Sequence, residues 1–165
     1  TYPVLAIGDD EHLRRVARTF DFALPRAKGK SGYYYDILQP DGTVLNRDAA
    51  AVVPGVAVTR RNADVLYWMV KQFDLMKRMG KSDRIRPEWE NAVRKLADAF
   101  VRTWKEEGTW GNYLHVETGK VAVFNTTSGQ WLRAAWLWLQ NTSAIRSTWK
   151  WPNRLHPTST ASFPL

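Results

Sequence analysis

Three carboxylates stand at the boundaries of expected secondary-structure elements. Asp64 opens a helical segment in RRNAD, Asp36 follows three tyrosines before a turn, and Glu117 lies in an ETG turn. Paired carboxyl groups can act as general acid and general base, and hydrolysis of a glycosidic bond needs such a pair. Structural roles compete: Asp64 can complement its helix dipole, Asp36 can be a solvated strand end, and Glu117 a plain turn residue. As catalytic candidates we rank them in the order Asp64, Asp36, Glu117.

Five further residues are candidates for binding a substrate: Arg60, Arg61, Tyr34, Trp68 and Trp110. Arginine forms paired hydrogen bonds with a carboxylate such as that of a uronic acid, although both arginines can equally be solvated residues at a helix start. The three aromatic side chains can stack on sugar rings. Core packing is the expected role of Trp68, whereas Trp110 lies in the loop GTWGN and has the better claim to a functional role.

Metal and cofactor sites are not expected. The chain has no cysteine, which excludes disulfides, thiol nucleophiles and cysteine metal sites. The three histidines, His12, His115 and His156, do not have the spacing of metal ligands. We therefore expect chemistry carried by carboxyl groups alone.

The elements that must position these residues are mainly helical. Apolar residues at helical spacing predict helices over 11–24, 61–80 and 87–108. Proline at position 25 is expected to end the first helix. The second helix is apolar around much of its circumference, which is typical of an inner helix, whereas the third has one apolar stripe, typical of an outer helix.

Short β-structure is expected between the helices. Residues 28–46 predict two strands around the turn Pro40-Asp41-Gly42, and the segment around 117–119 predicts a β-hairpin. The apolar segment 49–59 contains a Pro-Gly break and is expected to be irregular and partly buried. Another helix is expected to open after Ser128-Gly129.

Charge and hydropathy bear on possible partners. The net charge is +8, but half of this excess lies in residues 131–165, and the remainder is mixed with acidic residues. We find no nucleic-acid-binding motif and expect no nucleic-acid partner. The apolar runs are too short to cross a bilayer, so no membrane partner is expected either.

The order of these elements, together with the amino-acid sequence of four segments, resembles the six-hairpin glycoside hydrolases. The segments are SGYYYDILQPDGTVL, TRRNADVLYWMVKQFDLMK, PEWENAVRKLADAFVRTW and TWGNYLHVETGKVAVFNTTSG, and the resemblance covers about residues 5–129. Those enzymes are (α/α)6 toroids of alternating inner and outer helices. The resemblance implies a mainly α fold with short β-hairpins, in which residues 1–130 form about half a toroid. It also implies a cleft at the starts of inner helices, where Asp64 would lie.

Residues 131–165 depart from the family pattern. They hold five of the nine tryptophans, four Arg or Lys and no acid. Codons can be chosen for WLWLQNTSAIRSTWKW that, read one base earlier, give LALA and SKYFGNPKYLEV, which is wording typical of the family. We therefore expect that this tail is translated out of frame and that the chain is a truncated, frameshifted fragment. The tail is expected to be helical at its start and then irregular.

Two functional hypotheses follow, beside a third, an anion-binding basic module, that rests only on the net charge. The first is a glycoside hydrolase that acts on a glycoside, uronic glycosides included, by carboxyl acid–base catalysis. The alternative is a non-catalytic, self-associating fragment with at most residual carbohydrate binding. A half-ring would leave helix flanks uncovered, so we expect a homodimer or a higher homo-oligomer in either case. The sequence does not indicate a cellular location.

Overall fold

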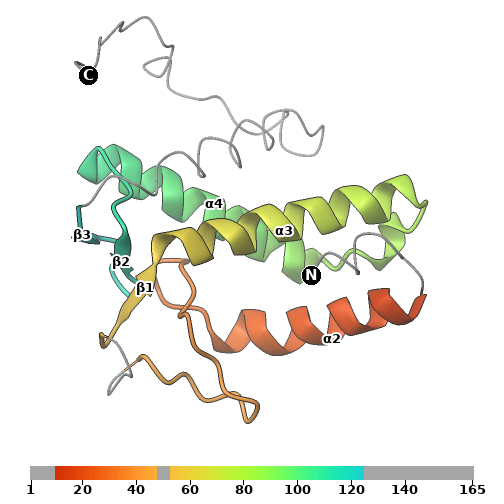
Figure 1. The fold of residues 1–165 in the computed structure, drawn as a ribbon. Helices are drawn as coiled ribbons and strands as arrows, with labels where there is room; N and C mark the ends of the chain where they lie inside the picture. Colours follow the sequence, from red (N-terminus) through yellow and green to blue (C-terminus); the bar gives the residue numbers. More distant parts are fainter. Residues whose placement is uncertain (1–9, 48–52, 125–165) are drawn as a thin grey trace, which may run out of the picture.

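The computed structural model describes residues 10–47 and 53–124, which form three α-helices and a three-stranded sheet (Figure 1). The elements are α2 (Asp10–Arg26), β1 (Val56–Val58), α3 (Thr59–Arg78), the short 3-10 helix η1 (Ser82–Arg84), α4 (Pro87–Glu107), β2 (Tyr113–His115) and β3 (Val121–Val123). The expected helix after position 129, the domain boundary at 130 and the frameshifted tail lie outside the described residues.

Helix α2 is tied by polar contacts to the segment that joins α3 to α4 and to the start of α4. Near the N-terminus of α2, the Asp10 carboxylate accepts a hydrogen bond from the Lys81 ammonium at 2.7 Å. Further along the helix, Asp21 accepts a hydrogen bond from the Trp89 indole at 2.9 Å and pairs with Arg86 at 2.7 Å. These contacts fix α2 at two points of its length, one to the segment between α3 and α4 and one to the start of α4.

Proline at position 25 does not end α2, contrary to expectation. The helix continues to Arg26, and the N–H of Ala27 still donates to the carbonyl of Ala23 at 2.9 Å. Pro25 has a backbone φ compatible with a helix and removes only one hydrogen bond. In the last turn the remaining bonds are enough to continue the helix.

Helix α4 lies at the centre of the described structure. Proline 87 occupies its first turn and Gly108 ends it with φ 69°, as is typical of a left-handed cap. It contacts both α2 and α3. The loop that carries the three tyrosines presses on its surface, because a side chain at Gly32 would meet the Lys95 carbonyl at 2.9 Å and the Ala99 methyl at 3.4 Å.

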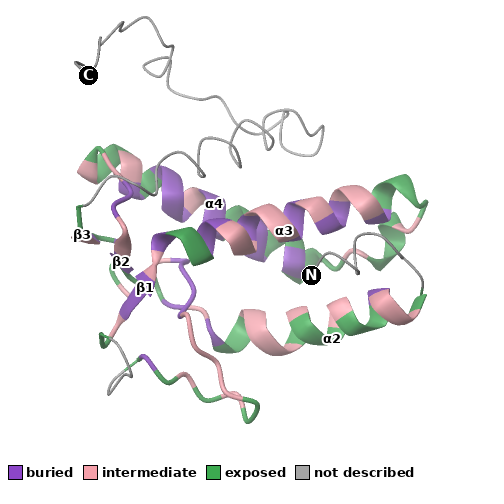
Figure 2. Ribbon diagram, in the orientation of Figure 1, coloured by how far each residue is buried: buried purple, intermediate pink, exposed green. Residues whose placement is uncertain are grey.

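The expected half-toroid is wrong for the part of the chain that the structure describes. Within the described residues the buried positions of α4 face one core shared with α3 and the sheet, and no alternating ring of inner and outer helices is formed (Figure 2). These buried positions include Ala92, Ala97 and Ala99, which are small and let neighbouring segments approach closely. The stripe of large residues in the sequence therefore underestimates how much of α4 is covered. Three helices around one core, with a sheet at one end, replace the alternating ring.

The sheet has the strand order β1-β2-β3 and is antiparallel. Val56 pairs with His115 and Val58 with Tyr113, while Tyr113 also pairs with Val123. The turn between β2 and β3 confirms the hairpin expected around 117–119. Strand β1 falls in a segment that was expected to be irregular, because its partner β2 is far away in the sequence.

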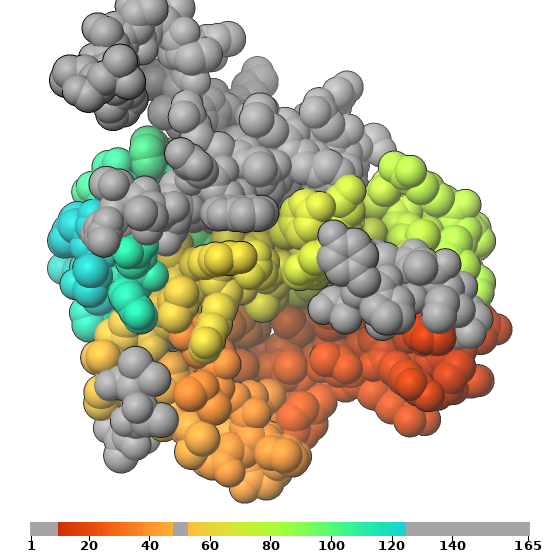
Figure 3. Space-filling view, in the orientation of Figure 1, coloured from red at the N-terminus to blue at the C-terminus, as the bar shows by residue number. Residues whose placement is uncertain are grey.

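Residues 28–46 form a loop rather than two strands. Two isolated bridges, Lys28 with Tyr34 and Leu38 with Val44, replace the expected ladders. The expected turn is present, since the N–H of Gly42 donates to the Gln39 carbonyl at 2.9 Å. Strands β2 and β3 gather at one end of the molecule, and α2 with residues 36–46 lies along its lower side in the space-filling view (Figure 3).

None of the helices within 10–47 and 53–124 combines the length and the apolar character that a bilayer crossing requires.

Candidate functional site

Two buried polar side chains fix the first turn of α3. The Thr59 hydroxyl donates to the Trp110 carbonyl at 3.2 Å, and its N–H donates to the Asn112 carbonyl at 2.9 Å. The amide of Asn62 accepts a hydrogen bond from the Tyr34 N–H at 2.8 Å and donates to the Tyr34 carbonyl at 3.0 Å. This two-way clamp holds the three-tyrosine segment, and the aspartate that follows it, against the start of α3.

Asp36 is the most buried of the three candidate carboxylates. Its side chain is 8% exposed. Its Oδ2 atom accepts a hydrogen bond from the Val58 N–H at 2.8 Å and lies 3.6 Å from the guanidinium of Arg61. Its Oδ1 atom is buried and has no hydrogen-bond partner among the described residues. Burial raises the pKa of Asp36 above its ordinary value, and the Val58 N–H and Arg61 oppose this shift.

Asp64 lies further along α3 than the sequence suggested. The helix begins at Thr59, so Asp64 is in the second turn and no acid occupies the first. Its carboxylate pairs with Arg60 at 3.8 Å, and both side chains are about half exposed. An exposed pair of this kind contributes little to stability. Asp36 with Arg61 and Asp64 with Arg60 are thus two separate ion pairs at the start of α3.

Glu117 is held in the ionised state by its neighbours. Its Oε1 atom accepts a hydrogen bond from the Tyr35 hydroxyl at 2.6 Å, and Oε2 accepts one from the Lys30 N–H at 3.4 Å. The Tyr35 hydrogen bond is the main reason why the pKa of Glu117 lies below its ordinary value. Arg47, whose guanidinium stands 5.2 Å from the centre of the Tyr35 ring, favours the same charge.

The two tryptophan candidates have environments opposite to those expected. Trp110 is buried, its indole donates to the Phe100 carbonyl at 2.7 Å, and its ring lies 4.4 Å from that of Trp104. This placement suits core packing. Trp68 is half-buried on α3, with its ring edge-to-face against Tyr67 at 5.1 Å. Of the two, Trp68 is the less buried.

Tyr34 is buried, and it lines a pocket between α2 and α4 rather than joining Asp36 and Arg61. The Tyr34 backbone nevertheless helps to place Asp36, because the Asn62 amide hydrogen-bonds to the N–H and the carbonyl of Tyr34.

Sequence reasoning missed Asn62 and Tyr35. Both are buried and polar, and both position the candidate carboxylates. A signal for Asn62 existed, since asparagine is a weak helix former and here stands in the first turn before a long apolar pattern. For Tyr35 the run of three tyrosines does not reveal which ring reaches a distant carboxylate.

Within residues 10–47 and 53–124, no group of three or more His, Asp or Glu side chains could hold a metal ion. Comparison of the chain with known protein families, with curated proteins and with solved structures finds no match. The resemblance of residues 5–129 to six-hairpin glycoside hydrolases therefore stays a prediction, and function has to be argued from the site itself.

Proposed function

We propose that this chain hydrolyses a glycoside that carries an acidic sugar, with Asp36 as general acid and Glu117 as the ionised carboxylate. The observation that carries the proposal is the opposite shift of two pKa values. Burial raises that of Asp36, whereas the Tyr35 hydroxyl lowers that of Glu117. Carboxyl groups whose environments separate their pKa values in this way are suited to act as an acid and a base.

Both carboxyls are held from the same two-residue segment. Tyr35 binds Glu117, while the next residue, Asp36, reaches β1 and α3. Because Oδ1 has no hydrogen-bond partner among the described residues, the proton of a neutral Asp36 would not be committed to another protein group. Its burial is what keeps that proton available.

The charge around the start of α3 supports an anionic substrate. Arg61 is 3.6 Å from Asp36, and its side chain is 61% exposed, so guanidinium donors remain accessible to a ligand. Protonation of Asp36 would free Arg61 to bind the carboxylate of a uronic acid, for which its planar donor pair is well matched. Trp68, half-buried on the same helix, offers an apolar surface to a sugar ring.

The test is hydrolysis of a panel of aryl glycosides that includes a glucuronide. We expect turnover of the acidic glycoside, and a loss of about a hundredfold or more in Asp36→Asn and in Glu117→Gln. Asp83→Asn is the matched control, because Asp83 is an exposed carboxylate in η1. Loss of activity in Asp64→Asn with full activity in Asp36→Asn would contradict the assignment of the acid.

A second candidate is a non-catalytic chain that retains at most carbohydrate binding. One observation favours it: both carboxylates already have protein partners, Val58 for Asp36 and Tyr35 for Glu117. Their role would then be to join the tyrosine segment to β1 and to the β2–β3 turn. Activity that stays at background on the whole panel, with folded wild-type protein, would favour this candidate.

A further inference from the structure

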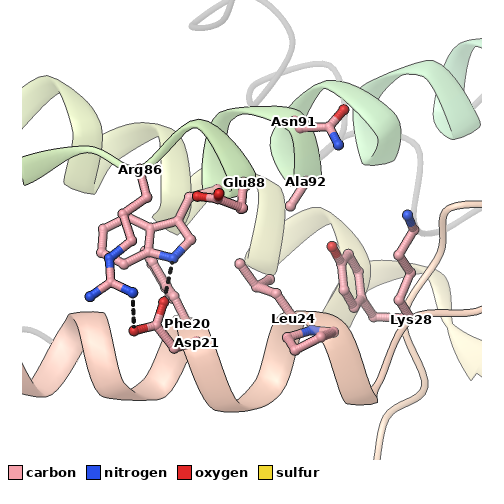
Figure 4. Close-up of a pocket in the computed structure, with 11 residues that line it drawn as sticks. Phe20, Asp21, Leu24, Lys28, Arg86, Glu88, Asn91 and Ala92 are labelled. Atoms are coloured by element: carbon pink, nitrogen blue, oxygen red, sulfur yellow. Dashed lines mark hydrogen bonds and ion pairs between the residues drawn. The ribbon is translucent and has the colours of Figure 1, made fainter.

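A pocket of about 400 Å³ lies between α2 and α4, and neither Asp36 nor Glu117 lines it (Figure 4). Its apolar wall includes Phe20, Leu24, Trp89 and Ala92. A volume of this size is within the range of small-molecule sites, which are mostly apolar and contain a few polar groups that orient the ligand. Lys28 and Tyr34 supply such groups here.

The Tyr34 hydroxyl is buried and has no hydrogen-bond partner among the described residues. The residue is 5% exposed, and burial raises the pKa of its phenol to about 12, so it is a neutral donor. A buried hydroxyl without a partner is unfavourable, and such groups are uncommon in folded proteins. A ligand atom that accepts this hydrogen bond would remove the penalty.

Backbone pairing places Lys28 directly opposite Tyr34. The two residues form an isolated antiparallel bridge, flanked by hydrogen bonds from the Gly29 N–H to the Tyr33 carbonyl and from the Tyr35 N–H to the Ala27 carbonyl, each 2.8 Å long. Residues directly opposite each other in such a pair present their side chains on the same face. The ammonium and the phenol can therefore bind one group together.

The charge of Lys28 is not balanced by a carboxylate among the described ion pairs. Partial burial, and then the nearby Lys95, lower the pKa of Lys28. Of the acids that line the pocket, Asp21 is already paired with Arg86 and accepts a hydrogen bond from Trp89. Figure 4 shows that pair at the end of the pocket opposite Lys28, with Glu88 on the α4 side.

We infer that this pocket binds a small amphipathic carboxylic acid, with its carboxylate on Lys28 and the Tyr34 hydroxyl and its apolar body against Phe20, Leu24 and Trp89. A monoanion fits better than a phosphate dianion, because one ammonium and one neutral hydroxyl would leave a second charge poorly compensated beside an apolar wall. This site is independent of the proposed acid–base cluster.

Isothermal titration calorimetry with octanoate tests the inference, with octanamide as the neutral probe of equal length. Octanoate is expected to bind at least about tenfold more tightly than octanamide, since charge-assisted hydrogen bonds are the stronger kind. Lys28→Met should weaken octanoate binding by about tenfold and leave octanamide binding nearly unchanged, whereas Tyr34→Phe should weaken the binding of both probes, because an amide carbonyl also accepts a hydrogen bond from the hydroxyl. Lys105→Met, which removes an exposed lysine of α4 outside the pocket, is the matched control.

The stability of the free variants separates a lost ligand contact from a folding defect. Tyr34→Phe removes a hydroxyl without a partner, so the free protein should be as stable as the wild type or more stable. Equal affinities for octanoate and octanamide, octanoate binding unaffected by both variants, or no binding to folded wild-type protein would each overturn the inference. Tighter binding of inorganic phosphate than of octanoate would also overturn it. Asp36→Asn should leave octanoate affinity unchanged whatever its effect on hydrolysis.

Discussion

Asp36 and Glu117 are joined through adjacent residues of one loop, yet their surroundings act on them in opposite directions. One carboxylate oxygen of Asp36 is buried without a partner, and the Val58 N–H and Arg61 offset only part of the resulting rise in pKa. Glu117 keeps solvent and gains a short hydrogen bond from Tyr35. The chemical difference between the two carboxyls therefore comes from burial and hydrogen bonding rather than from residue type.

This difference predicts opposite effects of pH on stability. A carboxyl with a raised pKa in the folded state contributes stability below its ordinary pKa, and this contribution is lost as the pH rises through the folded value. The wild type should therefore lose stability relative to Asp36→Asn as the pH rises from about 3 to 7. The measurement is the free energy of unfolding of the wild type and of Asp36→Asn, obtained from urea titrations at a series of pH values.

For Glu117 the sign is reversed. Its lowered pKa contributes stability above the ordinary value, and this stability is lost as the pH falls through the folded value. The wild type should gain stability relative to Glu117→Gln over the same rise in pH. If the stability difference from the wild type changed with pH in the same direction for both variants, the environments of Asp36 and Glu117 would not differ as their contacts indicate.

At the scale of elements, the described structure depends on close approaches to the central helix and within the sheet. The Tyr33 hydroxyl donates to Thr103 of α4 at 2.9 Å, and Thr103 donates to the Gly119 carbonyl at 2.8 Å. This relay ties the tyrosine loop, α4 and the β2–β3 turn together. Helix α4 therefore helps to hold the loop that carries Asp36 and the turn that carries Glu117, although neither residue belongs to it.

Two glycines with positive φ should respond very differently to alanine. Gly80 has φ 69° and open space around its Cα, so Gly80→Ala should cost about 1 kcal/mol through backbone strain alone. Gly111 has φ 56°, and a Cβ there would clash with the Val123 carbonyl of β3. Gly111→Ala should therefore cost roughly 2–5 kcal/mol, since overpacking adds to the strain.

Urea-induced unfolding of the two glycine variants beside the wild type provides the measurement. Equal losses of stability would mean that β3 does not pack on Gly111 as the structure has it.

At the scale of the whole molecule, self-association stays a prediction, but the reason for it changes. Met69 and Met76, which a half-ring would expose, are buried within the chain. Trp131, Trp136 and Trp138, on which that argument also relied, lie outside the described residues. Exposed apolar side chains occur instead beside β3, the outer strand of the described sheet, where Val123 and Phe124 are 45% and 58% exposed.

A second copy that packs against the β3 edge would cover these side chains. Light scattering at micromolar concentration should show a dimer or larger species, and Phe124→Lys should shift it towards the monomer. Met79→Lys, which changes an exposed apolar residue at the end of α3, should not. A wild-type mass of 19.0 kDa, that of the monomer, would contradict this expectation.

The sequence by itself determined the local features. Helical periodicity located the three α-helices of the described residues, Pro87 and Gly108 marked the ends of α4, and the ETG turn marked the hairpin. These features depend on contacts within one or two turns of chain, which a short window of sequence contains.

Only the tertiary structure decided the arrangement of the elements and the chemistry of each candidate. Strand β1 exists because β2 pairs with it, and α4 is central because alanines admit its neighbours closely. Asp36 rather than Asp64 is the buried carboxyl, because Asn62 draws the tyrosine loop onto α3. Burial, hydrogen-bond partners and therefore pKa values depend on contacts between residues distant in sequence, and periodicity carries no information about those contacts.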